Sequence, residues 1–484
     1  MESLVNAIKS LKCGSAPGDD EISNEMIKNY PSRTINILHR VFILCIRIGH
    51  FPRPWKRAKI KMIAKPKKDA SLSSNYRPIS LLSNVGKLME KLVKKTIDRA
   101  DIKHNIISDL HSGFRRGRST QESMVILAEE VSKARKCKQV VASVAIDVDK
   151  AFDRLNHSIV KYRIKNLPLP AKTKRIISSF LNDRILYVQE GETKSREVVM
   201  RAGSPQGAIG SPDIFILNSF DTPIDNDEAD EGGNQFADDL NAYAVAPTAR
   251  EAVSILKRRL AIIEDWSTCW SLIPSAEKST IICFTGSKRE RQIAEEMNVE
   301  LLGKKIEWNS EMKILGVKYD SGMKWEAHLK DLVNSAQFKV LAIAKMNRKI
   351  KFSNRALIMQ IFESLVISIF KYSCVAFINM PEKNWNRLES FYCRWLKIIF
   401  DLPLHMSNET ARRLFSASSL RNQLEHFAVK RFADMSKNVK SIQNLIFDYG
   451  KYAFRNGKDS LIDRIFRITQ IEKNLDCYFC PTGV

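Results

Sequence analysis

The sequence has little glycine and proline, and it has no long uninterrupted apolar run. Glycine and proline account for 19 and 16 of 484 residues, whereas apolar residues reach 44%. This composition excludes a collagen-like or low-complexity chain and supplies enough apolar surface for a sizeable core. The most apolar segment, residues 356–370, is interrupted by Gln360 and Glu363. We therefore expect no transmembrane helix and no membrane partner.

The amino terminus and the cysteines indicate the compartment. Residues 1–13 lack a basic segment followed by an apolar one, so we expect no secretory signal. The nine cysteines are odd in number and lie scattered through apolar surroundings, in a chain long enough to fold without disulfides. We expect reduced thiols in an intracellular protein of the nucleus and cytoplasm. The oligomeric state stays open.

Positive charge is in excess. Lys and Arg number 78 against 54 Asp and Glu, giving a net charge of +24 and a polyanionic partner as the expectation, with nucleic acid first. Residues 53–68 hold eight basic side chains and no acid, and Ile60, Met62 and Ile63 interleave with them as in a half-buried strand. Such a strand would present phosphate-binding side chains on one surface; a solvated charged face is the alternative. We interpret residues 221–231, with six acids and no base, as a solvated surface insertion.

A first carboxylate follows an apolar run. Residues 140–146 are small or β-branched, which predicts a fully buried strand, and Asp147 comes directly after them. An unpartnered carboxylate at that position would cost several kcal/mol, on the order of the penalty for a buried unpaired charge. Asp147 is therefore expected to have a cation or hydrogen-bond partner. A helix cap or a strand-end salt bridge is the alternative interpretation.

A second pair of carboxylates lies at a predicted turn. Residues 234–245 read as two short strands that flank Asp238 and Asp239. Because neighbouring side chains of a strand point to opposite faces, both acids can serve one site only at the turn, and we predict Asp238 as the inner ligand. Three carboxylates from two apolar segments favour Mg²⁺. Two such ions about 4 Å apart can activate a 3′-hydroxyl and stabilise a pyrophosphate leaving group, which is nucleotidyl transfer.

A glycine-flanked segment lies between these carboxylates. In Gly203–Gly207 the two glycines permit close approach of a ligand to the backbone, and Gln206 offers both a donor and an acceptor to a nucleotide. An ordinary tight turn is the alternative.

Taken together, segments of the chain between residues 6 and 400 resemble, in order, the reverse transcriptase of non-LTR (LINE-type, jockey-like) retrotransposons. The matching segments are Ser15–Asp19, Asn75–Leu82 with Lys87 and Glu90, Gly113–Arg115 with Ser119 and Thr120, Asp147–Asp153, Gly203–Gly207, Phe236–Asp239, Ser275–Ser279 and Ile314–Val317.

The resemblance implies an α+β fold, a right-hand polymerase with fingers, a ferredoxin-like palm and a helical thumb, plus a mostly helical C-terminal region. The implied divisions are an N-terminal helical extension (1–50), fingers and palm (51–285), a primer-grip region and thumb (286–400) and a helical C-terminal region (401–484). The implied function is an RNA-directed DNA polymerase of retrotransposon replication, with an RNA template, a DNA primer and dNTPs as partners.

The resemblance also implies roles for individual residues. Asp147 and Asp238 would bind two Mg²⁺ ions, with Asp239 assisting. The incoming nucleotide would meet the side chains of Arg77 and Gln206. Lys278 would sit near the leaving phosphates, and added positive charge there would come from Lys61 and Lys65.

Phe152 bears on the choice of sugar. It lies five residues after Asp147, where reverse transcriptases place a ring that leaves no room for a 2′-hydroxyl. Viral RNA-dependent RNA polymerases usually place an Asp near this position and carry Gly-Asp-Asp where this chain has Ala237-Asp238-Asp239. The resemblance therefore favours deoxynucleotides, although an ordinary core aromatic is an alternative for Phe152 alone.

Other functions stay open as alternatives. A domesticated or decayed element could bind RNA without catalysis, and a component of telomere maintenance or intron splicing would share the palm. Because about fourteen residues precede the first matched turn, we expect no endonuclease in this chain, and no ribonuclease H domain after the thumb. Cys477 and Cys480 have no histidine after them, so a zinc knuckle is not expected.

Overall fold

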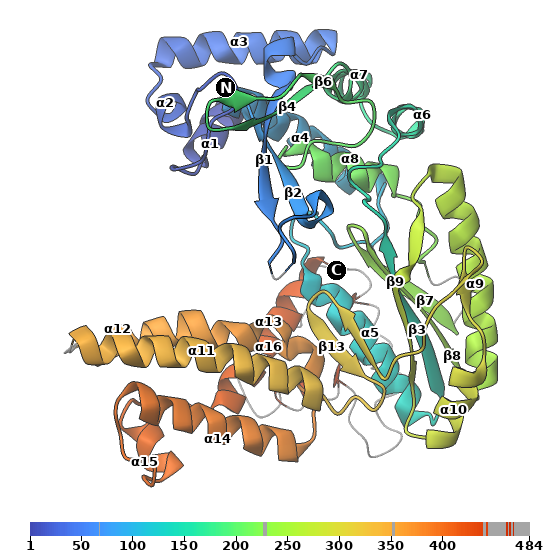
Figure 1. The fold of residues 1–484 in the computed structure, drawn as a ribbon, viewed down its shortest axis with the longest axis vertical. Helices are drawn as coiled ribbons and strands as arrows, with labels where there is room; N and C mark the ends of the chain where they lie inside the picture. The colour runs from blue at the N-terminus through green and yellow to red at the C-terminus, as the bar shows by residue number, and fades with distance from the viewer. Residues whose placement is uncertain are drawn as a thin grey trace, which may run out of the picture.

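The computed structural model describes residues 1–66, 68–225, 230–350 and 354–438, together with 442–443, 461–462, 464–465 and 468. Cys477 and Cys480 lie outside the described residues. In Figure 1 a mixed N-terminal part lies at the top, a sheet with covering helices at the right, and a group of long helices at the lower left.

The N-terminal part combines helices with a small sheet of order β2-β1-β4-β5, in which β6 also pairs with β4. Its elements are α1 (Glu2–Lys9), α2 (Asn24–Lys28), α3 (Ser32–Ile48), η1 (Arg53–Lys56), β1 (Arg57–Ala64), η2 (Ser73–Asn75), β2 (Tyr76–Leu82), α4 (Asn84–His104), α6 (His157–Asn166), α7 (Ala171–Leu181), β4 (Ile185–Glu190), β5 (Thr193–Lys194), β6 (Val198–Val199) and α8 (Gly210–Asn218).

Strand β1 is the half-buried basic strand that the sequence predicts. Ala58 and Ile60 are buried, whereas the alternate side chains are basic. Acids from other elements neutralise part of this face: the Arg57 guanidinium lies 2.8 Å from Asp19, and the Lys61 ammonium lies 2.9 Å from Glu190. The predicted basic surface therefore exists as a strand face, but it is less available to phosphates than the sequence suggests.

The central part is built on an antiparallel sheet of order β7-β8-β3-β9. In chain order these strands are first β3, then β7, β8 and β9, with α8 and α9 in the two longer connections; this is the strand order of a ferredoxin-like sheet. The elements of this part are α5 (Thr120–Lys136), β3 (Val140–Val148), β7 (Glu231–Phe236), β8 (Asp239–Ala246), α9 (Ala249–Trp270), β9 (Pro274–Phe284), α10 (Lys288–Glu296), β10 (Glu300–Leu301), β11 (Lys304–Lys305), β12 (Glu311–Ile314) and β13 (Val317–Asp320).

Strand β3 is buried on both faces, as its continuous apolar run predicts. Val140, Ala142 and Val144 belong to the cluster that includes apolar residues of α9, whereas Val141 belongs to the cluster that includes those of α5. The strand continues two residues beyond the predicted end at Ile146. It does so because Asp147 still pairs with β8 and β9.

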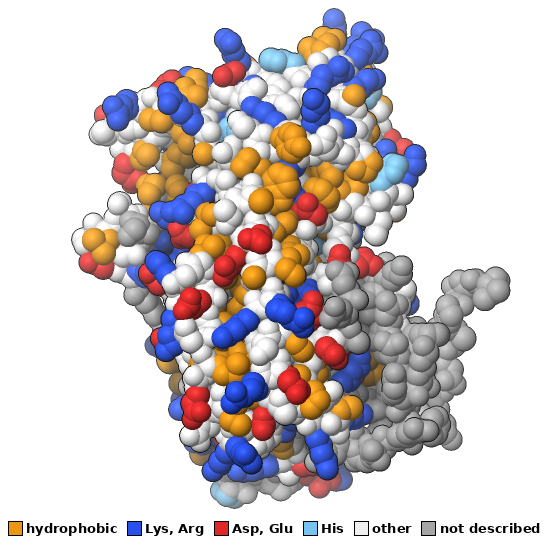
Figure 2. Space-filling view, turned by 90° about the vertical axis from the view of Figure 1, so that its right-hand side faces the viewer, with side chains coloured by type: hydrophobic (Ala, Val, Ile, Leu, Met, Phe, Trp, Pro, Cys, Tyr) orange, Lys and Arg blue, Asp and Glu red, His pale blue; other side chains and the backbone are white. Residues whose placement is uncertain are grey.

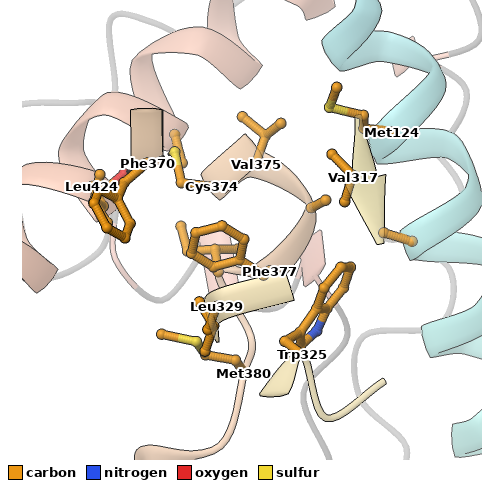
Figure 3. Packing of buried hydrophobic residues seen from close by; sticks show 14 of the residues in the cluster. Met124, Val317, Trp325, Leu329, Phe370, Cys374, Val375, Phe377, Met380 and Leu424 are labelled. Carbon is orange, nitrogen blue, oxygen red and sulfur yellow. Dashed lines mark hydrogen bonds between the residues drawn. The ribbon is translucent and has the colours of Figure 1, made fainter. Parts of the chain in front are cut away.

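The helical part packs against the central part through one continuous core. Its elements are α11 (Glu326–Ile350), α12 (Arg355–Phe362), the π-helical turn η3 (Glu363–Ile367), α13 (Ser368–Phe377), α14 (Glu382–Ile399), α15 (Asn408–Arg413) and α16 (Leu420–Asn438). Figure 3 shows this core: Met124 of α5 lies beside Val317 of β13, the ring of Phe377 of α13 lies near Trp325, and Leu424 of α16 lies near Phe370. The helical part is therefore anchored to α5 and to the β12–β13 hairpin.

One helical stretch, Arg355–Phe377, is long and apolar enough to cross a membrane by length and composition alone. Buried core helices pass the same test, and 44% of its most apolar window is buried. Phe362, Phe370 and Cys374 have no exposed surface and belong to the shared core. The stretch by itself is weak evidence for a membrane span.

The acidic segment differs in part from its prediction. Asp221 accepts a hydrogen bond from the buried Arg163, and Glu231 lies 2.9 Å from the buried Arg259. Ile224, between these acids, is 1% exposed. The interpretation as a solvated insertion holds only in part for the described residues of this segment. Asp221, Asp225 and Asp230 are exposed, but arginines on two distant helices pair with Asp221 and Glu231; residues 226–229 lie outside the described part.

Helix α5 begins at Thr120, and its first turn contains a buried acid. Ser119 donates its backbone N–H to Glu122 Oε1 at 2.9 Å, and the Arg118 guanidinium lies 3.6 Å away. Glu122 is 1% exposed, and this burial raises the pKa of its carboxyl to about 7.

The raised pKa of Glu122 predicts a pH-dependent stability. At Glu122 the folded chain binds a proton more tightly than the unfolded chain. The protonated carboxyl therefore contributes its full stabilisation of the folded chain below pH 4.5, and this stabilisation is lost as the pH rises through 7. The difference in free energy of unfolding between wild type and Glu122→Gln should fall by about 3 kcal/mol over that range. Urea unfolding of both chains at pH 5 and pH 8 measures it. A difference independent of pH would contradict the assignment.

Candidate active site

The three predicted acids lie at the end of the central sheet. Asp147 of β3 pairs in register with Asp239 of β8, and Phe236 of β7 pairs with Asp239 across a two-residue turn. That turn consists of Ala237 and Asp238, so all three acids come from adjacent backbone segments. The predicted pair of strands flanking an acidic turn is confirmed.

Ala237 adopts a backbone conformation that residues with a side chain rarely adopt. Its φ is +58°, which in a two-residue hairpin loop is a position usually taken by glycine. Gln235 supports the turn by donating from Nε2 to the Ala237 carbonyl oxygen at 2.7 Å. The unusual conformation is thus held by contacts around the turn.

The carboxylates repel one another. Partial burial and the negative charge of Asp147 raise the pKa of Asp238. Asp239 as a whole residue is exposed, but its carboxyl group is partly removed from water. This desolvation is the largest cause, and repulsion from Asp238 and Asp147 the next, of a pKa raised to about 6. A cation near these acids would relieve the repulsion.

Asp147 has a basic neighbour. The Lys278 ammonium, on β9, lies 3.6 Å from Asp147 Oδ1 and donates a hydrogen bond to Asp149 Oδ1 at 2.8 Å. This bond to Asp149 raises the pKa of Lys278 and lowers that of Asp149. The Lys278 and Asp147 side chains are 52% and 47% exposed, so water and incoming groups can reach the contact.

A small cavity of about 100 Å³ opens beside these residues. Its lining includes Asp147, Asp239 and Lys278, with Lys313 of β12. Asp238 is half-buried at the turn beside it. The register thus places Asp239, rather than Asp238, on the same sheet face as Asp147, and the assignment of Asp238 as inner ligand stays a prediction.

The donor chemistry of this end of the sheet fits a hard divalent ion, because three mutually repelling carboxylates offer only oxygen ligands. Within the described ranges, however, no three His, Cys, Asp or Glu side chains gather closely enough to hold a metal ion. Asp147 lies beside Lys278 instead.

The Gly203–Gly207 segment is held between two other parts of the predicted site. Ser204 donates its backbone N–H to the Phe152 carbonyl, and Gln206 accepts at its carbonyl from the Ser80 N–H of β2 at 2.7 Å. The Gln206 side chain donates to Asp153 Oδ1 at 2.9 Å. Gln206 is therefore positioned between Asp153 and the N-terminal sheet.

Phe152 belongs to a row of rings. It stacks on Phe215 of α8 at 4.7 Å between centroids and meets Phe114 edge-on at 6.2 Å. Phe114 in turn lies 6.1 Å from Phe236, next to the acidic turn. Phe152 is half-buried, so packing from one side fixes its ring while part of it stays accessible.

The β1–β2 hairpin carries the remaining predicted cations. It projects from the N-terminal part toward the centre of the molecule in Figure 1. The backbone N–H of Lys65 donates to the Asn75 carbonyl at 2.8 Å beyond the strand ends, and Arg77 is exposed on β2 opposite Ile63. Lys61 forms an exposed ion pair with Glu190, and the role implied for it stays a prediction.

These features lie within a segment that matches a known family. The family model described as reverse transcriptase (RNA-dependent DNA polymerase) matches residues 65–319, more than half of the 484 residues. This chain belongs to the reverse transcriptase family.

Curated relatives confirm the resemblance to jockey-like elements. The probable RNA-directed DNA polymerase from transposon BS of Drosophila melanogaster is 29% identical over 448 residues, covering 91% of this chain and 49% of the relative. The RNA-directed DNA polymerase from mobile element jockey of the same species is 26% identical over 453 residues, covering 91% of this chain and 48% of the relative. The chain thus spans about half the length of these relatives.

Among solved structures, apo telomerase from Candida tropicalis matches with a TM-score of 0.40 and 12% identity, covering 86% of this chain and 74% of that chain.

The reverse transcriptase motif around Gly113 has a role that the sequence did not show. Gly113 packs on the acidic turn so closely that a Cβ atom would lie 2.3 Å from the Ala237 nitrogen. The neighbouring Ser112 donates its N–H to the Gln235 carbonyl at 2.9 Å. Two segments 124 positions apart thus form one support for Asp238.

Asp149 is a second residue that sequence reasoning missed. It holds Lys278 more closely than Asp147 does. The sequence could have indicated Asp149, because residues two apart on a strand share a face and the end of β3 reads Asp147-Val148-Asp149.

Proposed function

We propose that this chain is an RNA-directed DNA polymerase that adds dNTPs to a DNA primer annealed to an RNA template, in the replication of a non-LTR retrotransposon. The observation that carries the proposal is the pairing of Asp147 with Asp239 directly beside the turn that contains Asp238. Family membership and the similarity to jockey-type polymerases support the same activity.

In this proposal the N-terminal part forms the fingers, the central sheet the palm and the long helices the thumb. Asp147 and Asp238 would hold two Mg²⁺ ions, with Asp239 assisting. When bound, such ions lower the pKa of the primer 3′-hydroxyl and stabilise the pyrophosphate leaving group. The chain's own residues would place the primer and the dNTP around these ions.

The nucleotide would be placed by residues around the acidic turn. Gln206, oriented by Asp153, would contact the incoming dNTP, and Arg77 and Lys65 on the hairpin would contact its phosphates. The stacked ring of Phe152 would leave no room for a 2′-hydroxyl. Lys278, now beside Asp149, would move to the leaving phosphates.

Primer extension tests the proposal. With an RNA template and a labelled DNA primer, dNTP incorporation is expected with Mg²⁺, is expected to stop with EDTA and to return when excess Mg²⁺ is added. Incorporation from rNTPs should be far slower, because of Phe152. Tight binding of the primed template without any extension would contradict the polymerase and leave a non-catalytic RNA-binding protein.

A further inference from the structure

A basic pocket lies in the N-terminal part, away from the acidic turn. It encloses about 590 Å³ between the C-terminal end of α3, η1, α6 and α7. It shares no lining residue with the cavity beside Asp147. One acid, Asp183, and six cations line it; the cations are Arg53, Lys56, Lys161, Lys165, Lys174 and Arg175.

The pocket cations lack acidic partners within the described part of the chain. Among the residues that the structure describes, none of the six pocket cations forms an ion pair. Lys161 and Lys174 donate only to neutral oxygens, at 2.5 Å and 2.7 Å. The positive charge of the pocket is therefore not neutralised by the chain.

Lys56 strengthens the case for an anionic ligand. The residue is 4% exposed and lines the pocket, and it makes no hydrogen bond to any described residue. Its burial lowers its pKa, while Asp183 raises it. Because the Lys56 ammonium has no acidic partner among the described residues, an anion in the pocket would form a charge-assisted contact with it.

The pocket walls are held in place before any ligand arrives. The stem of Arg175 packs on Gly49, where a Cβ atom would lie 2.4 Å from the Arg175 Cβ. Phe51 donates its N–H to Ser179 Oγ at 2.9 Å, and its ring meets Phe180 edge-on at 5.2 Å. Helix α7 and the segment after α3 are thus fixed relative to each other, which lowers the entropy cost of binding.

We propose that this pocket binds consecutive phosphates of a single-stranded nucleic acid, at a contact separate from the polymerase site. A single strand can bend its backbone into a hollow of this size, whereas a duplex is too wide and too stiff to enter it. Figure 2, which faces the right-hand side of Figure 1, shows Lys and Arg gathered toward the top, while basic and acidic side chains alternate below. The choice of a nucleic acid as the source of the phosphates rests on the proposed function; the pocket and its charges do not.

A charge-matched pair of variants tests this site. Lys165→Gln, Lys174→Gln and Arg175→Gln together remove three charges from the pocket. The control removes three exposed charges from α9 and α10, with Lys257→Gln, Arg258→Gln and Arg289→Gln. Binding of a labelled 30-nucleotide oligouridine RNA would be measured by fluorescence polarisation between 50 and 200 mM salt, after thermal unfolding has shown that both chains are folded.

The pocket variant should bind this RNA about tenfold more weakly at 50 mM salt. Its slope of log affinity against log salt should fall by about 2, as expected for three lost contacts to a single strand, and the control should change less than about twofold. Equal weakening by both variants would overturn the proposal. Tripolyphosphate binding that depends on the pocket charges, with RNA affinity unchanged, would also overturn it, because free polyphosphate would then be the ligand.

The experiment separates this inference from the proposed function. Extension by one dNTP of an RNA–DNA duplex primer with a one-nucleotide template overhang, at saturating substrate, should be the same in the pocket variant and in wild type. If wild type extends no primer but the pocket variant still loses RNA affinity, the polymerase fails and the pocket stands. If wild type extends primers and the two triple variants bind RNA alike, the pocket fails alone.

Discussion

Replacing Asp238 with asparagine should lower the rate of primer extension by about 1000-fold. The substitution keeps the size of the side chain but removes a negative charge from the end of the sheet where Asp147 and Asp239 also lie. Loss of one such charge-stabilising group at a reacting centre costs on the order of 10² to 10³ in rate. Single-turnover extension of a primed RNA template measures the effect.

The matched control is Asp265→Asn. Asp265 is exposed on α9, outside the proposed site, so its rate should stay within twofold of wild type. Affinity for the primed template should change little in Asp238→Asn, because the carboxylate is not proposed to bind the duplex. An extension rate in Asp238→Asn equal to that of the control would remove Asp238 from the catalytic site.

Replacing Gly113 with alanine should lower extension by about 100-fold without changing any charged residue. The added Cβ would lie 2.3 Å from the Ala237 nitrogen and 3.1 Å from its Cα, so the backbone of the acidic turn must move. Displacement of a reacting group by roughly 1 Å can cost about 10²-fold in rate. Overpacking should also lower the free energy of unfolding by about 1–3 kcal/mol.

Gly286→Ala is the control for this prediction. A Cβ at Gly286 would meet no atom within 4 Å, so both extension and stability should be close to wild type. Extension rates and urea unfolding of the two variants would be compared side by side. Full activity in a stably folded Gly113→Ala chain would show that the contact with Ala237 does not position Asp238.

The strands of the site could be predicted because their signals are local. The run before Asp147 consists of small or β-branched residues at every position, and both of its faces are indeed buried. The turn at Asp238 follows from two short apolar segments around adjacent acids. Which of these acids shares a face with Asp147 depends on the turn geometry, and the positive φ of Ala237 was not evident from its residue type.

Contacts between distant segments could not be predicted from local patterns. The approach of Gly113 to Ala237 depends on how the loop before α5 lies on the sheet. Asp221 and Glu231 of the segment after α8 looked solvated because their partners, Arg163 and Arg259, lie on other helices. Composition alone does not reveal such pairing.

The prediction of the basic surface was also limited by contacts between distant segments. The sequence located a dense run of cations at residues 53–68, but Arg57 and Lys61 pair with acids from other elements. The unpaired cations instead combine Arg53 and Lys56 of that run with cations of α6 and α7, more than 100 residues later. Tertiary structure decides which charges remain free to bind phosphate.

The central claim is that Asp147 and the Asp238 turn together hold two divalent ions. Electron paramagnetic resonance titration of Mn²⁺ would count the ions bound to wild type with a primed template and a non-hydrolysable dNTP analogue. We predict two ions for wild type and at most one for Asp147→Asn or Asp238→Asn. Two ions bound with unchanged affinity in both variants would contradict the account.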